Sequence, residues 1–191
     1  MARADLPNFA EPLINDEAVI YGSWARFMHQ LFKRIGGGKS YNLGGLLTAN
    51  TTAVGNVGSG ADNLITYSLE KNILLNAGDA ISIKAYGTFA DNSNNKTLKL
   101  IIGTTTLFST GAVAFQDQDW MLESEIIRTG AATQKCITTL YTDYADITNI
   151  VDYVAGTEDF TTALTIKCTG EATTTNDIVQ QGLTVKIFPA G

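Results

Sequence analysis

Few side chains in this sequence have the types and spacing that catalysis needs. The chain contains one histidine, His29, whereas Ser-His-Asp and Cys-His catalysis both need an imidazole beside a nucleophile. No serine lies in a G-x-S-x-G turn, and the GGGKS segment at Gly36–Ser40 lacks the first glycine of the phosphate-binding loop G-x-x-x-x-G-K-[ST]. A single histidine also fails to supply a histidine-based metal site. We therefore expect a non-enzymatic protein without a cofactor.

Two groups of carboxylates are the remaining candidates for chemistry. Glu123 and Glu125 alternate along one expected strand, where they could form a glycosidase pair, but alternating acids on an antiparallel strand usually mark its solvent face. A second group could supply oxygen ligands to calcium: Asp143, Asp146, Asp152, Glu158 and Asp159. Because its spacing does not match the EF-hand loop, we favour a solvated acidic connection over a metal site.

Aromatic side chains leave a carbohydrate-binding, lectin-like module open as an alternative function. Four of them could stack on sugar rings: Tyr86, Trp120, Tyr141 and Tyr153. A glycan on a host surface is the ligand that this alternative predicts.

The charge of the chain argues against nucleic acid as a partner. The net charge is −6, and residues 41–191 carry eight Lys or Arg against fifteen Asp or Glu. Binding to a phosphate backbone depends on clustered Lys and Arg. No apolar run approaches the length of a transmembrane helix, so we also expect no membrane insertion.

The first 38 residues are expected to form an extended arm and one amphipathic helix. The arm, residues 1–16, contains Pro7 and Pro12; the helix begins at Asp16 or Glu17, ends near Ile35 and is followed by three glycines. Apolar residues recur at helical spacing and define a candidate partner or oligomer interface: Ile20, Trp24, Phe27, Met28, Leu31, Phe32 and Ile35. The helix could pack on its own β-domain, but we favour contact with other copies or another protein.

Residues 39–63 are rich in Gly, Asn and Thr and are expected to form a linker, followed by a β-domain at residues 64–191. Alternating patterns predict eight strands: Leu64–Leu69, Ile81–Ala90, Thr97–Ile102, Thr105–Ser109, Asp119–Thr129, Gln134–Thr142, Ala163–Thr169 and Ile178–Phe188. Eight strands at this spacing favour an all-β antiparallel jelly-roll sandwich. Between Asp143 and Asp159, 3-4-3 spacing favours a short helix over a loop with one strand.

Cys136 and Cys168 each lie within an expected strand. We interpret them as two buried small hydrophobic residues, because free cysteine is often buried. A bridge between two strands is the alternative, and it would need an oxidising compartment.

The segment TTAVGNVGSGADNLITYSL at residues 51–69 resembles a module of structural proteins in tailed bacteriophages, where it opens a small all-β domain. Pro12 followed by Trp24, Phe27 and Leu31 is similar to the leader of many small phage tail and virion proteins. The leader and the whole module, which runs from residue 51 to the LIIG segment ending at Gly103, together cover about half of the chain, and neither brings a catalytic motif.

The resemblance implies a structural protein of the virion, assembled in the host cytoplasm and forming a homotrimer. Residues 1–38 would attach it to other virion proteins while the β-domain projects outward. A tail-associated fibre or appendage is the leading expectation, and a capsid decoration, cement or head-fibre protein is the alternative.

Overall fold

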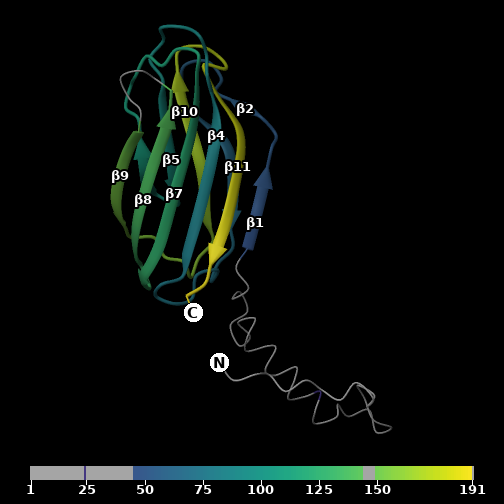
Figure 1. Cartoon of the computed structure of the whole chain (residues 1–191), viewed down its shortest axis with the longest axis vertical. Helices are drawn as coiled ribbons and strands as arrows, with labels where there is room; N and C mark the ends of the chain where they lie inside the picture. Colours follow the sequence, from purple (N-terminus) through teal and green to yellow (C-terminus); the bar gives the residue numbers. More distant parts are fainter. Residues whose placement is uncertain (1–23, 25–44, 144–148, 191) are drawn as a thin grey trace. The chain divides into compact units, whose positions relative to one another are not determined.

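The computed structural model describes Trp24 and residues 45–143 and 149–190. Within these ranges eleven strands form two antiparallel sheets, which pack face to face as a β-sandwich (Figure 1). All eleven belong to one compact unit, Gly44–Ala190. The prediction of an all-β antiparallel sandwich is therefore confirmed.

The larger sheet has the order β1-β11-β4-β7-β8-β9, with β2 also paired to β11. Its strands are β1 (Gly45–Asn50), β2 (Val54–Gly55), β4 (Ala80–Phe89), β7 (Gln118–Gly130), β8 (Thr133–Thr142), β9 (Asn149–Gly156) and β11 (Ile178–Phe188). The smaller sheet has the order β3-β10-β5-β6. Its strands are β3 (Gly60–Leu69), β5 (Thr97–Ile102), β6 (Thr105–Ser109) and β10 (Leu164–Ala172).

Each of the eight predicted strands coincides with a strand of the structure, namely β3 to β8, β10 and β11. Part of the segment predicted as a linker also belongs to the sheets. Strand β1 pairs with β11 from Gly45 opposite Ile187 to Asn50 opposite Leu183. Next to β2, the side chain of Asn56 accepts a hydrogen bond from the backbone of Ile178 at 2.9 Å. Pairing with the distant strand β11 and the hydrogen bonds of the buried Asn56 side chain order this segment. Neither interaction produces a periodic pattern in the sequence.

The short helix favoured between Asp143 and Asp159 is wrong for the described part of that connection. Residues Asn149–Gly156 form β9, which pairs with β8 from Asn149 opposite Tyr141 to Gly156 opposite Gln134. Apolar residues at 3-4-3 spacing also suit a strand that continues a sheet, because tertiary pairing overrides a short local pattern.

The predicted arm and helix of residues 1–38 lie outside the described residues, apart from Trp24. The proposed interface of Ile20, Phe27, Met28, Leu31, Phe32 and Ile35 lies outside them as well. Among the described residues, no helix has the length and apolar character needed to cross a bilayer.

Alternating apolar residues of both sheets fill the core. Along β4, Ile81, Ile83 and Ala85 point inward and are fully buried. Cys136 of β8 and Cys168 of β10 are both buried and free, as predicted. Burial raises the pKa of the Cys136 thiol to about 11 and that of Cys168 to about 12. Both cysteines therefore serve as small core residues.

A buried polar cluster joins the loops at one end of the sandwich. The side chain of Lys96 is fully buried, and its Nζ donates hydrogen bonds to the carbonyl oxygens of Asn92, Asn94 and Phe115 and to Asn92 Oδ1, at 2.6–3.1 Å. Asn92 also donates through Nδ2 to Asp177 at 2.6 Å. One asparagine thus bridges a buried cation and a buried carboxylate, which closes the loops after β4 and before β11.

Candidate ligand-binding groove

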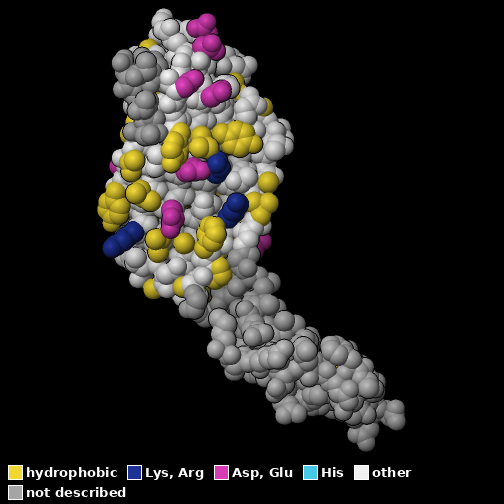
Figure 2. All heavy atoms as spheres, viewed as in Figure 1, with side chains coloured by type: hydrophobic (Ala, Val, Ile, Leu, Met, Phe, Trp, Pro, Cys, Tyr) yellow, Lys and Arg dark blue, Asp and Glu magenta, His cyan; other side chains and the backbone are white. Residues whose placement is uncertain are grey.

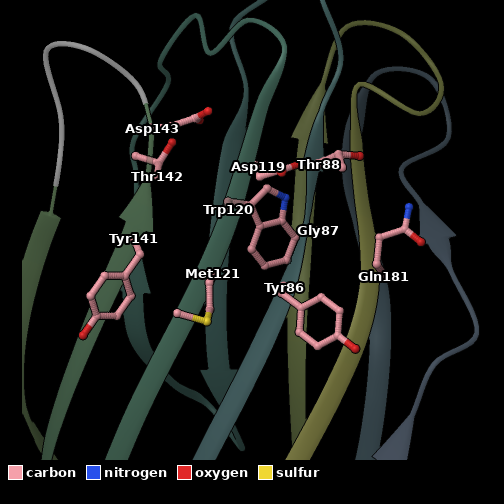
Figure 3. Close-up of a pocket in the computed structure, with 10 residues that line it drawn as sticks. All are labelled: Tyr86, Gly87, Thr88, Asp119, Trp120, Met121, Tyr141, Thr142, Asp143 and Gln181. Atoms are coloured by element: carbon pink, nitrogen blue, oxygen red, sulfur yellow. The ribbon is translucent and has the colours of Figure 1, made fainter.

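A groove of about 720 Å³ lies on the outer face of the larger sheet, over β4, β7, β8 and β11. Figure 3 labels its lining residues: Tyr86, Gly87, Thr88, Asp119, Trp120, Met121, Tyr141, Thr142, Asp143 and Gln181. In Figure 2, which shows this face, hydrophobic side chains form a band across the sheet, with acidic side chains beyond it. The outer face of this sheet therefore carries both apolar and charged side chains.

The floor of the groove is a row of side chains from three neighbouring strands. Tyr86 of β4 lies opposite Met121 of β7, and Met121 lies opposite Tyr141 of β8. Both tyrosines are 38% exposed. Tyr86 also faces Gly182 of β11, where any Cβ atom would overlap the tyrosine ring. The glycine therefore leaves the space in which the ring lies over β11.

Polar side chains line one end of the row. Thr88 of β4 lies opposite Asp119 of β7. Thr142 is the last residue of β8, and Asp143 follows it directly. Gln181 lies within a β-bulge, where the register between β11 and β4 shifts between Gln180 and Gly182. A bulge redirects a side chain out of the regular alternation. The groove therefore combines an aromatic and apolar floor with hydroxyl, carboxylate and amide groups.

Trp120 supports the groove from the core side. It is only 2% exposed, and its partner across the strands is Gly87, where a Cβ atom would approach the indole ring to 2.6 Å. Its ring centroid lies 6.1 Å from that of Phe89, which stacks on Phe115 at 4.4 Å. The indole Nε1 has no hydrogen-bond partner among the described residues. Of the four aromatic residues predicted to stack on sugars, Trp120 therefore presents no free ring face.

The other three predicted aromatic residues are exposed. Tyr86 and Tyr141 line the groove together, whereas Tyr153, 59% exposed on β9, does not line it. Sequence reasoning missed Met121, Thr88 and Gln181. Alternation along β4 and β7 places Thr88 and Met121 on the same outer face as Tyr86. Knowledge of how β4 and β7 pair would therefore have identified both residues as neighbours of Tyr86. The bulge at Gln181 leaves no such signal.

Glu123 and Glu125 lie on the outer face, as predicted for a solvent-facing pair. Glu123 forms an ion pair with Lys84 across the strands, at 2.9 Å between Oε1 and Nζ. Both glutamates line a second, smaller depression of about 260 Å³ that adjoins the groove at Tyr141.

Of the five acidic residues considered as a calcium site, Asp146 lies outside the described residues. Among the described residues, no three His, Cys, Asp or Glu side chains are grouped as a metal site requires. Glu158 is buried, and its Oε1 accepts four hydrogen bonds of 2.7–2.9 Å from the backbone and hydroxyl groups of Thr104 and Thr105. Burial alone would raise the pKa of Glu158, but these bonds lower it. Glu158 therefore anchors the β5–β6 turn, whereas Asp143, Asp152 and Asp159 are exposed.

No protein-family model, curated protein or solved structure matches this chain.

Proposed function

We propose that this chain is a non-enzymatic structural component of a tailed phage particle whose β-sandwich binds carbohydrate through the groove on its larger sheet. The observation that carries the binding function is the row Tyr86, Met121 and Tyr141, exposed beside hydroxyl, carboxylate and amide groups.

Such a lining suits a sugar better than a purely apolar ligand. The C–H faces of a pyranose ring can pack on the exposed tyrosine rings, and its hydroxyl groups can hydrogen-bond to the polar end of the groove. Asp119 and Asp143 accept hydrogen bonds from hydroxyls, whereas Gln181 and the threonines both donate and accept. The non-enzymatic part of the proposal comes from the sequence, in which no serine or cysteine motif of nucleophilic catalysis occurs.

The strand order supports assignment to the jelly-roll class. Strands β1 and β2, β11, β4 and β7 form one sheet, and β3, β10, β5 and β6 form the other. The chain crosses between the sheets at β2–β3, β3–β4, β4–β5, β6–β7, β9–β10 and β10–β11. With β1 and β2 counted as one interrupted strand and β8 and β9 as an added hairpin, this order supports a jelly roll of two four-stranded sheets. Several lectin and virion domains use this architecture, so it fits both parts of the proposal.

The place in the virion is supported by the sequence resemblance of residues 51–69 and of the leader. A tail-associated fibre or appendage that contacts a host surface glycan is the role consistent with both the sequence resemblance and the groove. A capsid decoration or head-fibre role is the second candidate, since the same groove would serve there. Residues 1–38 would attach the protein to other virion proteins, and the assembly would be a homotrimer.

Replacing either exposed tyrosine should weaken carbohydrate binding. We expect Tyr86→Ala and Tyr141→Ala each to lower the affinity for a glycan found on an array by about tenfold or more, because each removes about 1–2 kcal/mol of stacking and burial. Phe188→Ala is the matched control: Phe188 is an exposed aromatic residue of β11 that does not line the groove. Full affinity of both tyrosine variants, or no glycan binding by the native chain, would contradict the binding proposal.

Deleting residues 1–38 should separate attachment from folding. The described strands all lie within Gly44–Ala190, so the shortened chain should remain folded and soluble but should no longer join the particle. Labelling the full chain in electron micrographs of phage particles would distinguish tail from capsid. Absence of label on any particle would contradict the virion proposal, whereas normal incorporation of the shortened chain would contradict attachment through residues 1–38.

A further inference from the structure

We propose that the ligand is a linear oligosaccharide without acidic groups, which lies along β7 and β8 across both depressions of the outer face. This inference rests on the proposed carbohydrate-binding function and specifies the length and charge of the ligand.

The two depressions lie next to each other on the outer face of the larger sheet. Tyr141 lines both the larger groove and the smaller depression, which is also lined by Ser82, Thr139 and Ile137. Tyr141 and Ile137 lie four residues apart on β8, so about 13 Å separates them at the strand rise of ~3.3 Å per residue. One sugar ring does not span this length, whereas a short chain does.

The smaller depression repeats the chemistry of the groove. Ile137, 49% exposed, gives it an apolar surface next to Tyr141. Ser82, Thr139 and Glu125 supply hydroxyl and carboxylate groups beside that surface. A second sugar ring would therefore find an apolar contact and hydrogen-bonding partners there, as the first does at Tyr86.

The charges along this surface disfavour an acidic ligand. Asp119 and Asp143 lie at one end and Glu125 at the other. The ion pair of Lys84 with Glu123 at 2.9 Å lies between them, and it leaves Lys84 with its charge already compensated. Neither depression has a Lys or Arg among its lining residues, and exposed Lys186 of β11 lies opposite Ser82, beside the smaller one. A uronic acid, sialic acid or phosphate group would therefore meet mainly carboxylates along this surface. Hydroxyl groups can instead donate to those carboxylates.

The test is a length series measured by calorimetry on the full chain, with neutral glucose, mannose and N-acetylglucosamine oligomers from monosaccharide to hexasaccharide. For the series that binds, we expect affinity to rise by about tenfold or more from the shortest to the longest ligand and then to level off. Ile137→Ala should reduce binding of the long ligand by several-fold and leave the short one unchanged, whereas Tyr86→Ala should weaken both. A carboxylated chain of equal length should bind more weakly, and Asp119→Asn with Asp143→Asn should reduce that difference.

The outcomes separate this inference from the function on which it rests. Equal affinity for short and long ligands, with no effect of Ile137→Ala, would overturn the extended site and leave carbohydrate binding intact. Tighter binding of the carboxylated chain would overturn the charge preference. Absence of binding by every sugar would overturn the proposed function itself.

Discussion

Replacing Lys96 by methionine should lower the free energy of unfolding by about 3–5 kcal/mol, the range found when one partner of a buried charge network is removed. Methionine fills a similar volume but donates no hydrogen bond. Three carbonyl oxygens and Asn92 Oδ1 would lose the Nζ donor that lies 2.6–3.1 Å from them. Buried acceptors left without a donor carry their full desolvation cost.

The electrostatic part of this effect comes from Asp177. Burial lowers the pKa of Lys96, and the nearby carboxylates of Asp177 and Asp91 oppose that shift. Without Lys96, the buried carboxylate of Asp177 would keep its hydrogen bonds but lose its nearest buried cation. The loop that carries Phe115 would also lose its bond to Lys96, and Phe115 stacks on Phe89 beneath the groove.

Urea unfolding followed by tryptophan fluorescence measures this loss. Lys186→Met is the matched control, since Lys186 is exposed on β11, and it should change the free energy of unfolding by less than about 0.5 kcal/mol. A Lys96→Met protein as stable as the Lys186→Met protein would show that the buried cluster does not stabilise the loops.

The sequence predicted the strands well because each carries its own alternation. In β4, inward Ile81, Ile83 and Ala85 alternate with outward polar residues, and a one-residue slip would expose the inward side chains to water. In β8 and β10, Cys136 and Cys168 follow the same pattern and were correctly interpreted as buried. Local pattern suffices where one face of a strand is apolar and the other polar.

The wrong predictions concern segments whose structure is decided by pairing with another segment and not by their own residue pattern. Strand β1 is ordered by pairing with β11, more than 130 residues later, and β9 by pairing with β8. Glu158 was grouped with solvated acids, whereas four hydrogen bonds from Thr104 and Thr105 hold it in the β5–β6 turn. β1 and Glu158 have partners far away in the sequence, whereas β9 pairs with the strand directly before it, and composition reveals neither kind of pairing.

The candidate site was only partly predictable, because it also depends on how the strands pair. Residue type identified Tyr86 and Tyr141 as possible sugar contacts, but only the register places them in one row with Met121 between them. Residue type also favoured Trp120, which the register with Gly87 instead places over the core. A binding surface on a sheet depends on which strands are neighbours, and this information is absent from any single strand.

Acid should destabilise the fold, and Asp177 should account for about 2 kcal/mol of the loss. Burial alone would raise the pKa of Asp177, but hydrogen bonds from Asn92, Asn94 and Thr174 lower it to about 2. In the unfolded chain an aspartate titrates near ~3.9. Because the folded pKa is the lower one, the stabilisation is present above about pH 4 and is lost as the pH falls toward 2. Glu158 and Asp79, whose pKa values are also lowered, add to the loss in the same direction.

The matched variant for this prediction is Asp177→Asn, measured by urea unfolding between neutral pH and pH 2. Asparagine keeps the shape but not the charge, so the variant should be less stable than the native protein by about 2 kcal/mol at pH 7. The two proteins should converge as the pH falls below about 4, because the native carboxyl then becomes protonated as well. Asp152→Asn, on the exposed face of β9, should stay within about 0.5 kcal/mol of the native protein at pH 7. A constant difference between Asp177→Asn and the native protein at every pH would mean that the charge of Asp177 contributes nothing, and that its stabilising effect comes from the shape and hydrogen bonds that asparagine fails to reproduce.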